Sequence, residues 1–363
     1  MADHNMHFDF NPHHRVKISG AELEIGPSRV RLDETLECGE ALGVIPAQTI
    51  AHASEHYTRL TNGKCQPQFA ALVFEATRQP RALDFYFPLT QILTKKERPD
   101  FDQLVQHIVQ QPNFDLRLIG EYGNLTPQIP TSAAHLVAGH LAEIFFYRRD
   151  ILERFLSAPR HIWLYATPWA FERDGGQAGG DYHADRETLQ LVLSRLFEGF
   201  YEPTPGVAPF LHEFGHMLDF FDAGTGRMGR SYGLLPGLHP QDGAIYTPRA
   251  RKLFLKGKQL ELERYLLRYR GKAKADDPLP IGHPYVFQND TEFAAGYFEM
   301  FFRNPNYFAA QNADLYQAYV ELFGYDPRPA WKEDFSFYIN ENRNFYLTSG
   351  QKPWPPNLKV PES

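Results

Sequence analysis

The chain has 363 residues, of which 43% are hydrophobic, 14% aromatic and 22% charged, and its formal net charge is -7. This composition provides for a sizeable core and excludes an extensively disordered chain. The acidic balance gives no overall attraction to nucleic acid or to an anionic membrane, and no apolar run approaches the ~20 residues needed to cross a bilayer. We therefore expect neither a nucleic-acid partner nor a membrane partner.

The cysteines and the N-terminal segment indicate a cytoplasmic protein. Cys38 and Cys65 are too few for a disulfide scaffold, so we predict two reduced thiols, while a single bridge between them stays open. The segment MADHNMHFDFNPHH lacks the basic and apolar regions of a secretory signal. We interpret its histidines as incidental rather than as metal ligands; they are His4, His7, His13 and His14.

The chain is predicted to have three parts, divided by its glycine and proline content. Residues 1–125 form an N-terminal α+β region of unknown role, without a chemical motif. A Gly- and Pro-rich loop at 120–132 marks the boundary with a domain at 126–345, and a Pro-rich tail occupies 346–363.

Apolar periodicity and turn residues predict the elements of these parts. In chain order they are a helix over 100–111, a long helix over 132–157, a strand over 161–166, a glycine-rich loop, a strand over 188–194, and helices over 207–221 and 291–303. His135 and His140 are five residues apart on the long helix, so we interpret them as ordinary helix residues. The basic stretch at 249–274 is interpreted as a solvated helix face, with an acidic partner or nucleic acid as the alternative.

The string LHEFGHMLD, residues 211–219, carries the chemistry. His212 and His216 are four residues apart, so on a helix their imidazoles leave one face and can share a tetrahedral metal ion. Glu213 lies beside the metal, where it can take a proton from metal-bound water and pass it to a leaving amine. This HExxH pattern predicts a zinc-dependent peptidase with one Zn²⁺ per chain and a peptide or protein substrate.

Three carboxylates compete as the third ligand. Asp222 would need a glycine turn at position 219, which is Asp219 here, so it is disfavoured. Asp219 lies on nearly the same face as His212 and is better placed to orient an imidazole, or is a simple carboxylate of the last turn. Glu292 opens an aromatic-rich helix that Asn289 or Asp290 can cap, and burial there is costly unless the carboxylate is paired or metal-bound. We assign Glu292 as the ligand.

Glu299 shares a helix face with Glu292, so two carboxylates can point into one site. We interpret it either as an acceptor that supports a ligand or as a solvent-facing salt-bridge residue.

The strings HEFGHMLD and EFAAGYFEMFF resemble the peptidase domain of anthrax lethal factor and, more closely, the bacterial glucose-regulated (MtfA-type) zinc peptidases of the gluzincin type. The resemblance covers roughly residues 160–305. It implies an α+β fold with a zincin-like core, in which the HExxH helix and the Glu-bearing helix lie against a small mixed sheet. It also implies that Glu292 is the third ligand, that Tyr285 stabilises the oxyanion, and that the strand over 188–194 is the edge strand along which substrates lie.

Two alternatives to a peptidase stay open. The chain can be a regulator that binds a transcription factor or signalling protein as its partner, with weak or vestigial hydrolysis. The metal can also be purely structural, with a closed fourth position.

Overall fold

The computed structural model describes residues 80–198, 207–236, 238, 247–331 and 334–360, together with residue 74 and three N-terminal strands. Strands β1 (Val16–Ser19), β2 (Glu22–Ile25) and β3 (Ser28–Arg31) form an antiparallel meander. Both cysteines and the four N-terminal histidines of the sequence analysis lie outside the described residues.

A five-stranded mixed sheet has the strand order β5-β4-β6-β8-β7. The three central strands are parallel, and each edge strand runs antiparallel to its neighbour. Their bounds are β4 (Phe114–Gly120), β5 (Gly123–Asn124), β6 (Arg160–Tyr165), β7 (Gly180–His183) and β8 (Thr188–Val192). Together with the helices this confirms a mixed α+β architecture.

The expected edge strand over 188–194 is wrong in one respect, because β8 is not at the edge. It pairs with β6 on one side and with β7 on the other. The glycine-rich segment, predicted to be a loop only, ends in the short strand β7, which covers β8. Four residues beginning with a glycine carry too little apolar pattern to be recognised as a strand.

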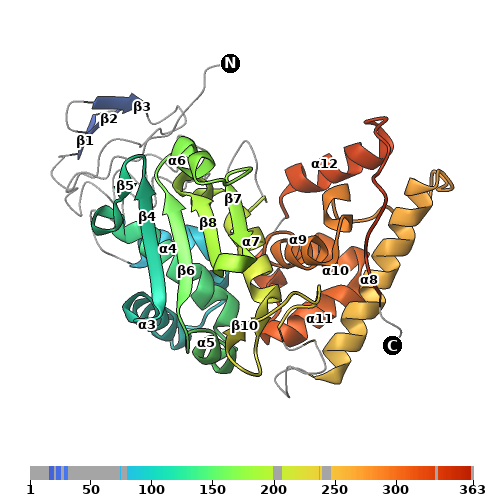
Figure 1. Ribbon diagram of the computed structural model, residues 1–363, viewed down its shortest axis with the longest axis horizontal. Helices are drawn as coiled ribbons and strands as arrows, with labels where there is room; N and C mark the ends of the chain where they lie inside the picture. Colours follow the sequence, from blue (N-terminus) through green and yellow to red (C-terminus); the bar gives the residue numbers. More distant parts are fainter. Residues whose placement is uncertain are drawn as a thin grey trace.

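Helices α3 (Glu97–Gln110), α4 (Thr131–Phe145), α5 (Arg149–Phe155) and α6 (Pro168–Arg173) accompany the sheet (Figure 1). The long helix expected over 132–157 is broken between α4 and α5. Arg148 has non-helical backbone angles there, and its guanidinium bonds Asp150 and the Leu322 carbonyl. Strands β4 and β5 precede residue 126, so the sheet runs across the boundary that the sequence predicts at 125.

The second half of the chain is helical. It contains α7 (Pro209–Asp219), α8 (Pro248–Tyr269), α9 (Asp290–Arg303), α10 (Pro305–Gln311), α11 (Ala313–Phe323) and α12 (Ser336–Leu347). A hairpin of β9 (Phe221–Asp222) and β10 (Arg227–Met228) follows α7, and the 3-10 turn η6 (Pro284–Phe287) precedes α9. Figure 1 shows α7 between the sheet and the cluster of α8 to α12.

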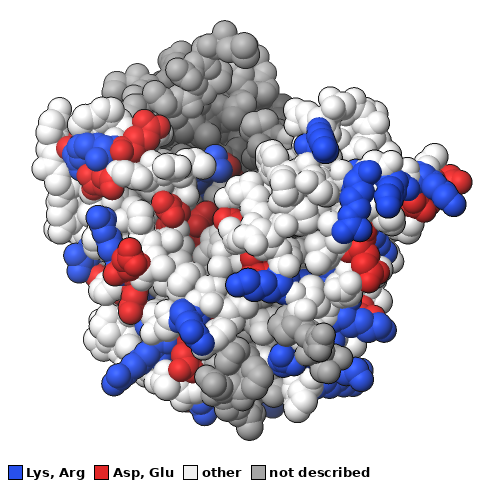
Figure 2. All heavy atoms as spheres, turned by 45° about the vertical axis from the view of Figure 1, so that its right-hand side comes forward, with Lys and Arg blue, Asp and Glu red and all other residues white. Residues whose placement is uncertain are grey.

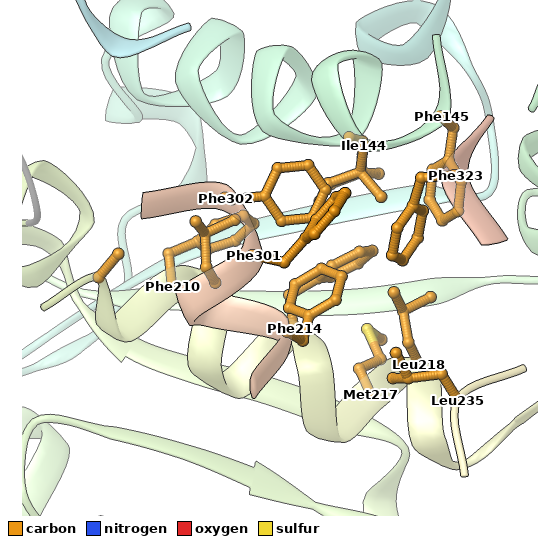
Figure 3. Packing of buried hydrophobic residues seen from close by; sticks show 14 of the residues in the cluster. Ile144, Phe145, Phe210, Phe214, Met217, Leu218, Leu235, Phe301, Phe302 and Phe323 are labelled. Atoms are coloured by element: carbon orange, nitrogen blue, oxygen red, sulfur yellow. The ribbon is translucent and has the colours of Figure 1, made fainter. Parts of the chain in front are cut away.

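One apolar face of α7 packs against side chains from both halves of the chain, so that they form a single core (Figure 3). Phe210, Phe214, Met217 and Leu218 of α7 are buried against side chains of three other helices. These are Ile144 and Phe145 of α4, Phe301 and Phe302 of α9, and Phe323 of α11. Each such side chain contributes roughly 1.5–3 kcal/mol by burial, so the helix is held rigidly and its opposite face is fixed in orientation.

The basic stretch of the sequence analysis is α8 and the turn after it. Several of its cations have acidic partners, such as Arg249 with Glu321 and Lys256 with Asp314. Figure 2 shows Lys and Arg on this side of the molecule mixed with Asp and Glu rather than forming one continuous basic surface. Within the described part of the chain, no helix has the length and apolarity that a bilayer crossing requires.

Candidate metal centre

Helix α7 places the two histidines of the motif side by side. Pro209 occupies its first turn, where the missing N–H costs no hydrogen bond, and the helix continues to Asp219. His212 and His216 are one turn apart on the face opposite the core, and their ring centroids are 4.9 Å apart. Both are half-buried, so they are partly shielded from water yet reachable.

Helix α9 brings Glu292 to the same place from 80 residues further along the chain. The Asn289 side chain caps the helix by accepting from the Glu292 N–H at 2.8 Å, which puts Glu292 in the first turn. Gly215 lets α7 and α9 touch, since a Cβ at that position would lie 2.9 Å from Ala295 Cα. The close approach of the two backbones makes the three side chains converge.

The donor atoms of His212, His216 and Glu292 lie close together. Glu292 Oε2 is 3.1 Å from His212 Nε2 and 3.3 Å from His216 Nε2. Tetrahedral zinc with bonds of about 2.0–2.1 Å separates neighbouring ligand atoms by about 3.3 Å. Among the described residues these three form the one group of His, Cys, Asp or Glu whose ligand atoms gather within 4.8 Å. The donor set of two imidazoles and one carboxylate also fits catalytic zinc.

The three convergent side chains interact with one another by charge. Burial acts against protonation of His212, but bonds to Glu292 and Glu299 outweigh it and raise its pKa well above the ordinary value. Burial likewise opposes ionisation of Glu292, yet its bonds to the two histidines hold its pKa far below the usual range. The two shifts have opposite directions, as expected for an imidazole and a carboxylate that stabilise each other by charge.

Glu299 supports the site from one side of α9. Its Oε2 lies 3.4 Å from His212 Nδ1, and its Oε1 accepts from the Ala208 N–H at 2.5 Å. An acceptor at Nδ1 keeps the proton there and leaves Nε2 free for a metal. Only 6% of Glu299 is exposed, so the reading of it as a solvent-facing salt-bridge residue is wrong.

Tyr285 reaches the site from η6. Its hydroxyl donates to Glu292 Oε1 at 2.9 Å, while the other oxygen of that carboxylate faces the histidines. Gly296 makes this approach possible, because a Cβ there would lie 2.4 Å from Val286 Cγ1. Burial, followed by the charge of Glu292, raises the pKa of the Tyr285 phenol, which keeps it a hydrogen-bond donor at neutral pH.

Glu213 lies between the ligands and the edge strand β7. A Cβ at Gly180 would come within 3.2 Å of Glu213 Cγ, so the glycine lets the strand pass directly over the carboxylate. Burial raises the pKa of Glu213, although the two neighbouring histidines lower it. A raised pKa suits a general base that must later release its proton.

The backbone of strand β7 runs beside Glu213 with one of its sides turned away from β8. The Val192 N–H donates to the Gly179 carbonyl, so Gly179 is in a hydrogen-bonded pair of the ladder. Bonded and non-bonded pairs alternate in an antiparallel ladder, so the backbone groups of Gly180 and Tyr182 point away from β8. The Gly180 N–H donates to the Gln177 carbonyl at 3.3 Å, which leaves the Gly180 C=O and both groups of Tyr182 on this edge. The strand thus presents an edge to which a peptide can pair.

Neither of the other two carboxylates joins the ligand group. Asp222 accepts from the Gly224 and Thr225 N–H groups and closes the turn after β9. Asp219 is buried and accepts from the Ser231 hydroxyl and the Leu234 N–H, which anchors the loop after the hairpin. Burial raises its pKa to about 6, while the Ser231 hydroxyl and the charge of His216 act in the opposite direction, so an influence of Asp219 on this imidazole stays a prediction.

Two residues that matter around the site are not predicted from the sequence. The sequence places Gly180 in a glycine-rich loop, whereas it begins strand β7. Lys258 was not singled out, although it lies with Glu261 in the stripe between Phe254 and Tyr265, where helical spacing predicts apolar residues. All four side chains are buried, and two opposite charges in such a stripe are a readable signal of buried ion pairs.

No family model and no curated protein matches this chain. The assignment of its chemistry therefore depends on the site itself.

Proposed function

We propose that this protein is a zinc-dependent peptidase with a zincin-like core, in which His212, His216 and Glu292 hold one Zn²⁺. The convergence of these three donor atoms within 4.8 Å, with Glu213 beside them, carries the proposal. Bound zinc would supply a Lewis acid and a water of lowered pKa, with a fourth position left for that water.

The residues of the chain divide the remaining work. Glu213 takes a proton from the attacking water and transfers it to the departing nitrogen of the scissile amide. The Tyr285 hydroxyl donates a hydrogen bond to the oxyanion that develops on the carbonyl oxygen. Glu299 holds the His212 ring in the orientation and tautomer that binding requires.

An extended peptide is the substrate that fits the edge strand. The outward C=O of Gly180 and the outward N–H and C=O of Tyr182 would pair with its backbone, independently of its sequence. Because Gly180 lies against Glu213, a peptide held on β7 passes close to the general base.

The first test is metal content. The purified protein should carry about one zinc per chain, and the Glu292→Ala variant should bind it far more weakly. Absence of zinc from the wild-type protein, even after zinc is added back, would overturn the proposal.

The second test separates chemistry from binding. The Glu213→Gln variant should keep zinc and lose about 10²–10⁴-fold in the rate of peptide cleavage. Glu172→Gln, an exposed substitution on α6, is the matched control and should leave the rate unchanged. Full activity of the Glu213→Gln protein would sink the assignment of the general base.

A further inference from the structure

The C-terminal tail is hydrogen-bonded to the segment that contains Tyr285 and Glu292. The Asn357 N–H donates to the Phe287 carbonyl at 3.0 Å, and the Lys359 N–H donates to Asp290 Oδ1 at 2.9 Å. Phe287 is the last residue of η6 and Asp290 is the first of α9. Both tail bonds therefore fall within residues 285–292.

The rest of the tail follows α8. The Tyr265 hydroxyl donates to the Trp354 carbonyl at 3.0 Å, and Leu358 packs against the core. Figure 1 shows the tail running alongside α8 after leaving α12. The tail is thus an extended strap between α8 and the start of α9.

Asp290 is the point where three separate segments meet. Lys258 of α8, only 1% exposed, places its Nζ 2.8 Å from the same Oδ1 that receives the tail N–H. Gly233, which has a left-handed backbone (φ +63), lies against Asp290 so closely that a Cβ would be 2.1 Å from Asp290 Cβ. The loop containing Gly233 is in turn anchored on Asp219, three residues after His216.

These contacts stabilise the first turn of α9, the part of the helix that opens most readily. The N–H groups of a first helical turn have no partners within the helix, and helix ends fray more readily than helix centres. Glu292 lies in that turn, so its carboxylate is only as well positioned as the turn is. The buried ammonium of Lys258 also requires the Asp290 carboxylate, since an unpaired charge in that place is costly.

We propose that residues 354–359 of the tail, acting through Phe287 and Asp290, are a positioning element that holds the first turn of α9 in the metal-binding arrangement. The inference rests on the zinc site of the proposed function and adds a remote segment that controls its affinity. Release of the tail weakens metal binding without removing any ligand.

Proline substitution tests this with a matched control in the full-length protein. Asn357→Pro/Lys359→Pro removes the two donating N–H groups, whereas Asn357→Ala/Lys359→Ala keeps them and trims the same exposed side chains. Zinc affinity, measured by competition with a chromophoric chelator, should fall about tenfold in the proline pair, as for other supports of metal ligands, and less than twofold in the alanine pair.

Hydrogen exchange of the metal-free protein gives a second readout. Amides of residues 285–295 should exchange faster in the proline pair than in the alanine pair, while those of α11 stay unchanged. Equal zinc affinity and equal exchange in the two pairs would overturn the inference. If the double proline variant fails to fold, Lys359→Pro against Lys359→Ala, with one bond removed, should show a smaller loss in the same direction, and no difference would again overturn it.

The outcomes distinguish the inference from the function on which it rests. A wild-type protein without zinc affinity overturns both. A wild-type protein that binds zinc and cleaves peptides, together with proline variants that bind zinc equally well, overturns only the role of the tail.

Discussion

Substitution of Glu299 tests whether this carboxylate orients the imidazole of His212 for metal binding. In Glu299→Gln, the amide oxygen can still accept from the buried Ala208 N–H, but the amide NH₂ faces His212 Nδ1, which is itself a donor. We expect zinc affinity to fall 10–100-fold, about 1.4–2.7 kcal/mol, with little loss of folding stability. Glu299→Ala should lose the same affinity and about 1–3 kcal/mol of stability besides, because the Ala208 N–H is left without its acceptor.

Two measurements separate these effects. Chelator competition gives the zinc dissociation constant, and urea unfolding of the metal-free protein gives the stability. The reasoning predicts that Gln and Ala variants agree in zinc affinity and differ in stability. Wild-type zinc affinity in the Glu299→Gln variant would refute the role of Glu299 Oε2 in holding His212. Equal stability of the two variants would refute the role of Glu299 Oε1 as the acceptor for the Ala208 N–H.

Two further predictions concern Tyr285 and Asp219. Tyr285→Phe should reduce the turnover number for peptide cleavage about 10²–10³-fold, as steady-state kinetics would show. It should also weaken zinc binding by up to about tenfold in chelator competition, because the hydroxyl donates to Glu292 Oε1. Undiminished turnover would contradict its oxyanion role. Asp219 has a folded pKa of about 6 against an ordinary 3.8, so its contribution to stability is present below pH 3.8 and is lost as pH rises through 6. Asp219→Asn keeps an acceptor for the Leu234 N–H. Its stability relative to the metal-free wild type, measured by urea unfolding, should rise by about 2.4 kcal/mol between pH 4 and pH 7. Parallel pH profiles of the two proteins would contradict the burial argument.

The local parts of the site could be predicted from the sequence because they depend on one helix at a time. The four-residue spacing of His212 and His216 places them on one face of any helix that forms there. The cap at Asn289 and the apolar spacing after it predicted a helix that begins near Glu292, and the structure has it at Asp290–Arg303. The mixed α+β class was expected from the family resemblance, and the mixed sheet with its helices agrees with it.

What only the tertiary structure decided are contacts between segments far apart in the chain. The position of β7 outside β8 depends on a four-residue strand whose pairing, not its composition, defines it. The orientation of Glu299 toward His212 follows from the contact of Gly215 with Ala295 across two helices. Lys258 of α8 and the tail likewise meet at Asp290 only because the tertiary structure brings these separate segments together. Apolar periodicity predicts which face of a helix is buried. The elements that pack against that face depend on the packing of the whole chain, which a local sequence pattern does not contain.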